Sequence, residues 1–451
     1  MTIPNKMYIA GEWRDASDGA TIGIVDPATE EAVDSVPRAT ADDLDAALAA
    51  ADAAYKTWRE VDAWTRSAKL RKAAEWVRAH VAEISDALSE EQGKTLPECT
   101  GEVNAAADQF DWYADEARRI YGRVIDGHSR QHRLLVMRQP IGVVAAFSPW
   151  NFPALLSSRK IAPAIAAGCA IIVKPPIEAP RTVLYLARAC EEAGIPAGVL
   201  NMVTGNSGMI CKHLLDSDIV RKVTLTGSVP IGQEILHQCA QGIKAVSMEL
   251  GGHAPVLIFP DADPVAAAET CARGKFRNNG QVCIASSRFY VHESIAESFI
   301  ATFVEVARSM KLGVGRDPGT DIGPLANKRR LEAAEHFVAD AVAKGAQLRC
   351  GGKRPEGFLK GFYFEPAVLT GVTPDMAIMR EEPFCSVAPI ATFTDLEDGL
   401  AKANATEFGL AGYVFTNDTR TAFLASEGIE AGLIGVNTLL LATAQIPFRG
   451  I

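Results

Sequence analysis

Several features that would assign the chain to a specialised class are absent from its 451 residues. No apolar stretch reaches transmembrane length without a charge or a proline, and no apolar run follows basic residues at the N-terminus. Neither a membrane span nor a signal peptide is therefore expected. The formal charge of -10 disfavours nucleic acid and anionic membranes as main partners. With 48% hydrophobic and 22% charged residues, the composition is ordinary for a soluble globular protein.

Metal-binding and disulfide patterns are also absent. The 9 cysteines form no CxxC pair and no cluster with histidine at metal-ligand spacing. A dispersed, odd set of thiols without a signal peptide indicates a reducing compartment, so we predict a cytoplasmic protein without a metal site. Most of the thiols are expected in the core. Cys283 differs, because it lies between the polar run "RNNGQ" and the strand-like run "SSRFYVH".

The GxGxxG dinucleotide fingerprint is missing too, yet the middle of the chain alternates short apolar strands with helices. From residue 139, "IGVVAAF", "AIIVKP", "VLNMVTG", "KVTLTG" and "KAVSMEL" read as strands, with a helical pattern after each of the first four. Such βαβ units predict an α/β fold with a doubly wound parallel sheet, whose ligands bind at the carboxyl ends of the strands.

Helices and a hairpin are expected before this sheet, and a second α/β region after it. Residues 40–95 read as two amphipathic helices, and Thr40 with Asp43 forms a capping box at the first. Residues 119–138 read as a hairpin that turns at Asp126-Gly127. The second α/β region is expected to run from about residue 251 to 430.

Polar residues of catalytic type follow the predicted strands. Asn151 lies in the rigid turn "FSPWNFP", Lys174 ends a strand in "VKPP", and Glu249 ends the last strand in "SMELGGHAP". Gly227 and Ser228 precede a helix, where free N–H groups favour a phosphate. Each of these residues alone also fits a structural role: a turn that seals the sheet, a solvated strand end, a surface glutamate or a helix cap.

The combination is more informative than its parts. An amide donor, a carboxylate, a lysine and a phosphate-type turn are all predicted at the carboxyl ends of one sheet. Cys283 follows Glu249 by 34 positions (283 − 249) in a polar loop. These are the components of covalent catalysis through a thiol.

The motifs "PWNFP", "VKP", "TGS", "MELGG", "GQVC" and "EEPF" occur in an order and at spacings that resemble the NAD(P)-dependent aldehyde dehydrogenase superfamily over essentially the whole chain. The resemblance implies that Cys283 attacks the aldehyde carbon and that Asn151 and the Cys283 backbone N–H hold the oxyanion. Hydride would pass to NAD or NADP. Glu249 would activate the water that hydrolyses the thioester, and Lys160 matches a lysine near the proton-relay path.

The same resemblance implies a set of cofactor-binding residues: Lys174, Trp150, Gly205, Gly227, Ser228, Leu250, Glu382 and Phe384. Two positions depart from the family's pattern. Ile177 stands where NAD-preferring members carry an acid, which leaves NAD and NADP as alternatives. Cys385-Ser386 replaces the usual Gly-Pro after Phe384.

Two arginines narrow the class of substrate that the resemblance implies. Arg277 and Arg159 match arginines with which succinate-semialdehyde dehydrogenases grip a carboxylate, and Thr443 would add a hydroxyl. Succinic semialdehyde is the substrate that the resemblance favours. Glutarate semialdehyde, 2-oxoglutarate semialdehyde and an aromatic aldehyde are the alternatives, and either arginine alone also fits a structural ion pair.

The resemblance also implies the domain organisation: an NAD(P)-binding domain (1–118 and 139–250), an oligomerisation hairpin (119–138), a catalytic domain (251–430) and a return segment (431–451). A homodimer or homotetramer is expected. Relatives continue past the "PF" motif into an assembly strand, so we expect a truncation at Ile451. Two rival classes are a catalytically retired member, which the presence of Cys283 disfavours, and a coenzyme A-acylating relative, which Glu249 disfavours.

Overall fold

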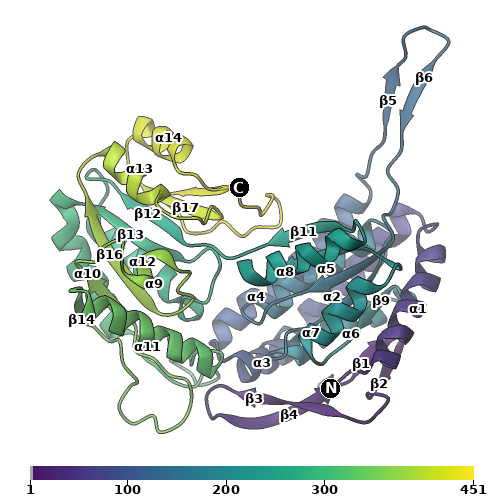
Figure 1. The fold of residues 1–451 in the computed structure, drawn as a ribbon, viewed down its shortest axis with the longest axis horizontal. Coiled ribbons are helices and arrows are strands. Elements are labelled where there is room, and N and C mark those ends of the chain that lie inside the picture. Colours follow the sequence, from purple (N-terminus) through teal and green to yellow (C-terminus); the bar gives the residue numbers. More distant parts are fainter. Residues whose placement is uncertain (1–3) are drawn as a thin grey trace. The chain divides into compact units, whose positions relative to one another are not determined.

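The computed structural model describes residues 4–451, and the packing of Cα atoms divides them into two compact units (Figure 1). Unit 1 comprises the residues up to Val25, Ala32–Leu88 and Thr100–Met248, and unit 2 comprises Asp26–Glu31, Ser89–Cys99 and Glu249–Ile451. In this described part of the chain, no helix combines the length and the apolar run that a membrane crossing requires.

Unit 1 is built on a seven-stranded sheet with the order β11-β10-β7-β8-β9-β1-β2. Its strands are β7 (Val143–Phe147), β8 (Ala170–Lys174), β9 (Leu200–Met202), β10 (Val220–Thr226), β11 (Ala245–Glu249), β1 (Met7–Ile9) and β2 (Glu12–Arg14). The intervening helices are α5 (Pro153–Ala166), α6 (Pro180–Glu192), α7 (Ser207–Asp216) and α8 (Val229–Gln241). The predicted alternation is confirmed. The antiparallel strands β1 and β2 at one edge were not predicted.

The register of the parallel strands decides where the loops of unit 1 meet. β7 and β8 are buried along their whole length, as the continuous apolar runs of a parallel sheet require. Phe147 pairs with Lys174 on one side and with Leu225 on the other, and Val173 pairs with Met202. The carboxyl ends of β7, β8, β9 and β10 therefore lie at one edge of the sheet.

Four helices precede this alternation: α1 (Ala41–Trp58), α2 (Ala63–Ala79), α3 (Val81–Gln92) and α4 (Leu96–Ala117). The capping box at α1 is confirmed, because the Thr40 side chain accepts from the Asp43 N–H and the Asp43 carboxylate accepts from the Thr40 N–H. The prediction of two helices over residues 40–95 is wrong. Asp62 caps a second helix, and the irregular backbone of His80 separates α2 from a third.

Two small antiparallel sheets complete unit 1 and its border. β3 (Thr21–Asp26) pairs with β4 (Glu31–Pro37), and β5 (Arg123–Asp126) pairs with β6 (Arg133–Val136). Figure 1 shows the β5–β6 hairpin extending away from the helices of unit 1. Its register joins Asp126 to Arg133, so residues 127–132 form the loop and the predicted tight turn at Asp126-Gly127 is wrong.

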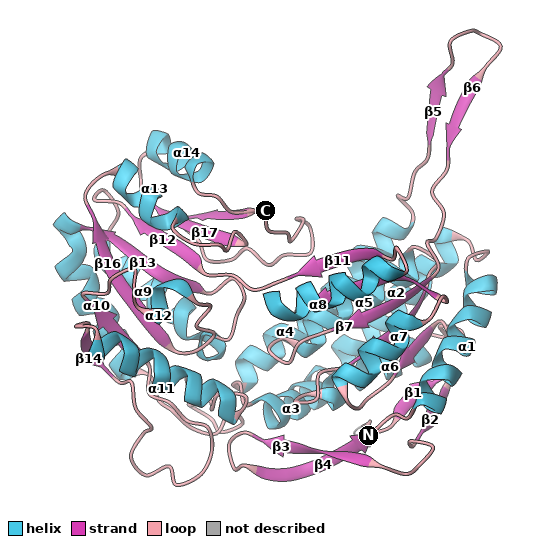
Figure 2. Cartoon of the chain, viewed as in Figure 1, coloured by secondary structure: helices cyan, strands magenta, loops and turns pink. Residues whose placement is uncertain are grey.

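Unit 2 contains the second seven-stranded sheet, with the order β14-β15-β16-β13-β12-β17-β18 (Figure 2). The strands are β12 (Ala254–Ile258), β13 (Ser286–His292), β14 (Gln347–Cys350), β15 (Ala367–Thr370), β16 (Val387–Phe393), β17 (Ala411–Phe415) and β18 (Leu433–Val436). The helices are α9 (Pro264–Phe276), α10 (Ala296–Ser309), α11 (Lys328–Ala343), α12 (Ala377–Arg380), α13 (Leu396–Asn404) and α14 (Thr419–Gly428), with 3-10 turns η1 (Arg277–Gly280) and η2 (Glu293–Ile295).

The division into units differs from the predicted segmentation in two respects. Asp26–Glu31 and Ser89–Cys99, predicted within the first domain, pack with unit 2. The region after residue 430 does not leave the second sheet, because β18 pairs in parallel with β17. Leu433 and Ile434 are half-buried or buried apolar residues at this edge, which favours the pairing. The functions predicted for the domains stay predictions.

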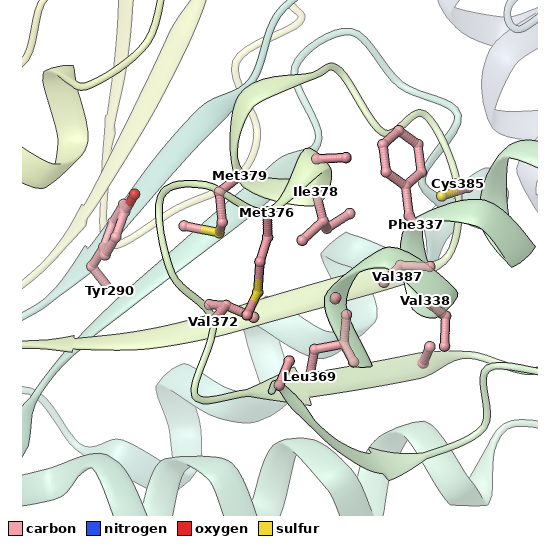
Figure 3. Close-up of a cluster of buried hydrophobic side chains, with 14 of the residues drawn as sticks. Tyr290, Phe337, Val338, Leu369, Val372, Met376, Ile378, Met379, Cys385 and Val387 are labelled. Carbon is pink, nitrogen blue, oxygen red and sulfur yellow. The ribbon is translucent and has the colours of Figure 1, made fainter. Parts of the chain in front are cut away.

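A buried apolar cluster fills the part of unit 2 between its sheet and helices α11 and α12. Figure 3 shows Met376, Ile378 and Phe337 among its members, together with Cys385. The Cys385 thiol is fully buried, and burial raises its pKa to about 11. The cysteine that replaces the family's usual glycine is therefore a core residue in this fold.

Candidate functional site

The loop that carries Cys283 begins at the end of α9. Lys275 and Phe276 still belong to that helix, and Arg277–Gly280 form the 3-10 turn η1. Asn278 and Asn279 adopt left-handed backbone angles, with φ of 48° and 55°, and asparagine tolerates this region better than other side chains. The chain reverses within a few residues, which brings the nucleophile candidate to the start of β13.

Amide side chains hold this loop in place. Gln92 Nε2 donates to Asn278 Oδ1 at 3.0 Å, and the Asn278 N–H donates to the Glu98 carboxylate at 2.7 Å. Asn279 Nδ2 donates to the carbonyl oxygen of Gly323 at 2.9 Å. Gln281 Nε2 donates to the Asn278 carbonyl, and Gln281 Oε1 accepts from the N–H of Ala326, both at 3.0 Å. The polar run before the cysteine is therefore a set of buried braces.

Cys283 lies in a turn closed by the hydrogen bond from the Ala285 N–H to the Val282 carbonyl, 2.9 Å long. It is half-buried, whereas six of the nine cysteines are buried. Close backbone approach requires glycine at position 252, since a Cβ there would lie 2.5 Å from the Cys283 carbonyl oxygen. Tyr413 Oη donates to the Ile284 carbonyl oxygen at 2.6 Å and so holds the following residue.

A cavity of about 90 Å³ adjoins this turn within unit 2. Val282 and Ile284, the neighbours of Cys283 in the chain, line it together with Arg277 and Tyr413. Burial raises the pKa of the Tyr413 hydroxyl, the charge of Arg277 opposes that rise, and Cys283 adds to it. Tyr413 thus lies close enough to the predicted nucleophile Cys283 and to the predicted anion-binding Arg277 for both to affect its pKa.

The "ELGG" segment and the predicted ribose carboxylate lie side by side. Glu249 is the last residue of β11 and is half-buried. The Gly252 N–H donates to Glu382 Oε1 at 3.1 Å, and a Cβ on Gly251 would lie 2.5 Å from Glu382 Oε2. Burial raises the pKa of Glu382 to about 7, although the hydrogen bond from Gly252 favours the ionised form.

The loops of unit 2 gather at the amino ends of its strands. β12 follows Gly251-Gly252, β13 follows Cys283, and β16 follows Glu382. Ala254 pairs with Ser286 in this parallel sheet, so the first two loops meet at one edge. The predicted placement at carboxyl ends holds for the loops of unit 1. Cys283 precedes β13, as the strand-like run after it predicted, and no sheet edge was predicted for Glu382.

In unit 1, Asn151 lies in the loop after β7 and is only 2% exposed. Ser148 and Ser157 join the two ends of this loop through their hydroxyl oxygens, which are 2.7 Å apart. The buried Glu102 carboxylate accepts from the N–H of Ala154 at 2.9 Å and thereby caps α5. The loop that carries Asn151 is thus held by contacts on both of its sides.

Lys160 and Arg159 follow on α5. Lys160 Nζ donates to the hydroxyls of Thr224 and Thr226 at 3.3 and 2.8 Å, which directs it along β10 toward its carboxyl end. Arg159 is half-buried and lies near Tyr113, whose pKa burial raises and Arg159 lowers. Their predicted roles in proton relay and substrate binding stay predictions.

The predicted cofactor residues of unit 1 share the same sheet edge. Lys174 Nζ donates to Ser207 Oγ at 2.7 Å, and burial lowers the pKa of this lysine to about 8. Ser228 is the N-cap of α8 and makes no side-chain cap bond, so its hydroxyl does not compete for the N–H groups of the first turn. Gly205 has a φ of 137°, which permits the turn before α7.

A cavity of about 480 Å³ lies beside this edge of unit 1. Ile177, Asn206 and Met209 form one part of its lining, and Arg38 with Thr40 forms another. An apolar side chain therefore stands at the position where a carboxylate was expected for NAD preference. A lysine, a helix N-terminus and a cavity at one sheet edge fit a dinucleotide phosphate and ribose.

The remaining predicted residues are scattered around these loops. Trp150 and Leu250 are half-buried next to Asn151 and Glu249, respectively. Phe384 has a φ of 46° and is half-buried. Thr443 is exposed, its N–H donates to the Leu441 carbonyl, and it does not line the cavity that holds Arg277.

The sequence alone did not reveal four supporting residues: Glu102, Ser207, Gln92 and Tyr413. Each acts on a loop distant in sequence: Glu102, for example, is 52 residues from the N–H that it caps. No local spacing marks such pairs. Of these four residues, Ser207 was the easiest to infer from the sequence, because it follows the predicted strand "VLNMVTG" at the sheet edge where Lys174 was expected.

The sequence model described as "Aldehyde dehydrogenase family" matches residues 13–451. The glutarate-semialdehyde dehydrogenase of Pseudomonas putida is 41% identical over 446 residues, which cover 99% of this chain and 92% of that protein. The succinate-semialdehyde dehydrogenase [NADP(+)] of Escherichia coli gives the same identity and coverage. A crystal structure of an NAD-dependent aldehyde dehydrogenase from Sinorhizobium meliloti superposes with a TM-score of 0.97 at 35% identity, covering 100% of this chain and 90% of that one.

Proposed function

Because the chain belongs to the aldehyde dehydrogenase family, we propose that it oxidises a short aldehyde with a carboxylate at its other end, such as succinic semialdehyde. The enzyme uses NAD or NADP and converts an aldehyde into the acid. The proposal adds the class of aldehyde. The observation that carries it is the cavity shared by Arg277 and the two chain neighbours of Cys283.

In this proposal, the thiolate of Cys283 attacks the carbonyl carbon and forms a thiohemiacetal. The Cys283 backbone N–H donates to the oxyanion, and such a donor is worth about 3 kcal/mol in comparable sites. The family resemblance assigns the role of second donor to the Asn151 side chain. Arg277 binds the distant carboxylate, which fixes the orientation of the aldehyde. The cofactor, when bound, would supply the hydride acceptor that oxidation of this adduct to a thioester requires.

The thioester is then hydrolysed. Glu249 removes a proton from the attacking water, and the Cys283 thiolate leaves as the acid forms. Lys174, Ser228 and Glu382 would hold the cofactor through a ribose, a phosphate and the second ribose. The lysine–serine contact, the uncapped helix start and the glycine cradle around the Glu382 carboxylate support these roles.

The experiment is an initial-rate panel of aldehydes with NAD and NADP. Succinic semialdehyde should exceed an uncharged aldehyde of equal length in kcat/KM, and Arg277→Ala should remove most of that difference. Cys283→Ala should abolish NAD(P)H formation, whereas Glu249→Gln should slow turnover after an initial burst. Retained turnover in Cys283→Ala would contradict the assigned nucleophile, and equal effects of Arg277→Ala on both aldehydes would contradict the anion site.

Two rival outcomes belong to the same panel. An acyl-coenzyme A product, formed only when coenzyme A is added, would show an acylating enzyme and contradict the role of Glu249. Glutarate semialdehyde, 2-oxoglutarate semialdehyde and an aromatic aldehyde complete the panel, since the Pseudomonas putida relative is named for the first of them.

We further propose that the protein is cytoplasmic and assembles as a homodimer or homotetramer. All nine cysteines are free, which fits a reducing compartment. The isolated hairpin β5–β6 exposes large apolar side chains, among them Val124, Leu135 and Met137, each about 70% exposed. A two-stranded hairpin is marginally stable alone, so a partner surface is expected. Light scattering after size exclusion tests the assembly, and a monomer at micromolar concentration would contradict it.

A further inference from the structure

The cavity beside Arg277 has one wall that the proposed reaction does not use. Leu439, from the segment after β18, lines it together with residues of the Cys283 loop. Leu439 also packs against α9: a Cβ on Gly274 would lie 2.2 Å from Leu439 Cδ1. The absence of a side chain at position 274 therefore creates the notch that the Leu439 side chain occupies.

The backbone that carries Leu439 is fixed to the sheet. The Asn437 N–H donates to the Val414 carbonyl at 2.8 Å, and Asn437 Nδ2 donates to the Thr416 carbonyl at 2.8 Å. The Asn437 side-chain oxygen accepts from the Thr416 N–H at 3.1 Å. Asn437 itself has a φ of 54°, which turns the chain toward α9. A side chain that is wedged at its tip and anchored at its backbone is a rigid wall.

Resting on the proposed function, we infer that Leu439, wedged into the Gly274 notch, limits the length of the substrate and makes the enzyme prefer a four-carbon over a five-carbon semialdehyde acid. Arg277 stands at the C-terminal end of α9, three residues after Gly274, so the carboxylate-binding group and the wall share one helix end. The cavity that Arg277, Leu439 and the two chain neighbours of Cys283 line has a volume of about 90 Å³. The rest of this lining is mainly apolar, through Val282 and Ile284.

The physical reason is the fixed spacing of two anchors. The aldehyde carbon must reach the Cys283 sulfur while the carboxylate reaches Arg277. An additional methylene in the chain has to bend into the wall, and a rigid wall cannot recede. One methylene in such a pocket typically changes discrimination by about 10- to 200-fold.

The test compares kcat/KM for succinic and glutaric semialdehyde in matched variants. Leu439→Ala removes three carbon atoms from the wall and should raise the ratio of glutaric to succinic kcat/KM by about 10-fold. Gly274→Ala places a methyl 2.2 Å from Leu439 Cδ1, which pushes that side chain toward the cavity, so the same ratio should fall. Leu359→Ala is the control, because Leu359 is 97% exposed and lies outside the cavity.

The outcomes separate this inference from the proposed function. An unchanged ratio in Leu439→Ala, or shifts of the same sign in Leu439→Ala and Gly274→Ala, would overturn the role of Leu439 even if succinic semialdehyde is a good substrate. A wild-type preference for glutaric semialdehyde would overturn it too. Failure of both semialdehydes in the wild type, with turnover of an uncharged aldehyde, would overturn the proposed substrate class. Leu439→Met, similar in volume, should keep the wild-type ratio and shows that the effect is steric.

Discussion

The affinity for the cofactor should depend on pH through Glu382. This carboxylate is packed against Gly251 and receives the Gly252 N–H at 3.1 Å, and burial raises its pKa to about 7. The ionised form can accept from two ribose hydroxyls and from Gly252 with both oxygens, whereas protonation turns one oxygen into a donor and weakens both as acceptors. With a pKa of about 7, roughly 10% of the carboxyl groups are ionised at pH 6 and roughly 90% at pH 8.

If only the ionised form binds, the dissociation constant for NADH should fall by about 10-fold from pH 6 to pH 8, equivalent to about 1.4 kcal/mol. Fluorescence titration with NADH measures this directly. NADH is the better probe, because it lacks the 2′-phosphate of NADPH, whose own ionisation near pH 6 would obscure the effect.

Glu382→Gln is the matched variant, because its amide keeps the size of the side chain and removes the ionisation. Its dissociation constant should stay level over this pH range and resemble the wild-type value at the acidic end. A wild-type constant that changes less than twofold, or an equal slope in Glu382→Gln, would refute the reasoning.

Glu382 should also make the free energy of unfolding depend on pH. Since the folded state raises the pKa of Glu382 from 4.5 to about 7, its contribution to the free energy of unfolding is fully present below pH 4.5 and is lost as pH rises toward 7. The loss corresponds to about 3 kcal/mol as an order of magnitude. Urea unfolding at pH 5 and pH 8 should show a smaller loss of stability with pH in Glu382→Gln than in the wild type.

Two further predictions concern stability. Glu102→Ala leaves the N–H groups that cap α5 without their buried acceptor and should cost about 1 to 3 kcal/mol in urea unfolding, with Glu102→Gln closer to the wild type; a loss below 0.5 kcal/mol would contradict the cap. Lys275 is fully buried, its Nζ has no hydrogen-bond partner within residues 4–451, and burial lowers its pKa to about 8. Because this folded-state pKa lies below the ordinary 10.5, the penalty for the buried charge is fully present below pH 8 and fades toward pH 10.5. Lys275→Met should therefore be more stable than the wild type at pH 7, and the difference in stability should be smaller at pH 10. Equal stability of both proteins at pH 7 and pH 10 would contradict it.

The sequence predicted unit 1 well, because its strands are short, apolar and separated by helices with clear ends. Continuous apolar runs such as β7 and β8 can only be buried strands or helix segments, and their length favours strands. The loops then follow from topology, since parallel strands place their carboxyl ends together. Asn151, Lys174 and Ser228 were therefore predicted at one edge, and the register confirms that edge.

The third helix over residues 81–92 and the long hairpin loop were not predictable from the same signals. The break at His80 is a single irregular residue within a polar, helix-favouring stretch, and periodicity does not register one residue. The loop at 127–132 begins with "GH", and an Asp-Gly pair normally signals a two-residue turn. Here β5 continues through Asp126 and β6 begins only at Arg133, and both strands are exposed throughout, so no burial pattern fixes where they turn.

Cys283 lies at the amino end of β13, whereas ligands of parallel sheets are expected at the carboxyl ends of strands. The order of the sequence motifs therefore pointed to Cys283, and the sheet topology alone would not have done so. A helix N-terminus can hold an anion at the carboxyl end of a strand, as predicted at Ser228, whereas the segment directly before β13 is the turn that carries Cys283. The loop that carries Cys283 is fixed by buried amides instead, and each amide satisfies backbone groups that a reversing chain would leave without partners. Asparagine and glutamine are needed there because they donate and accept at once without carrying charge into the core. The run "NNGQ" therefore specifies a rigid loop. The exposed Arg277 precedes this loop and the half-buried Cys283 follows it, so the loop holds the two side chains in place relative to each other.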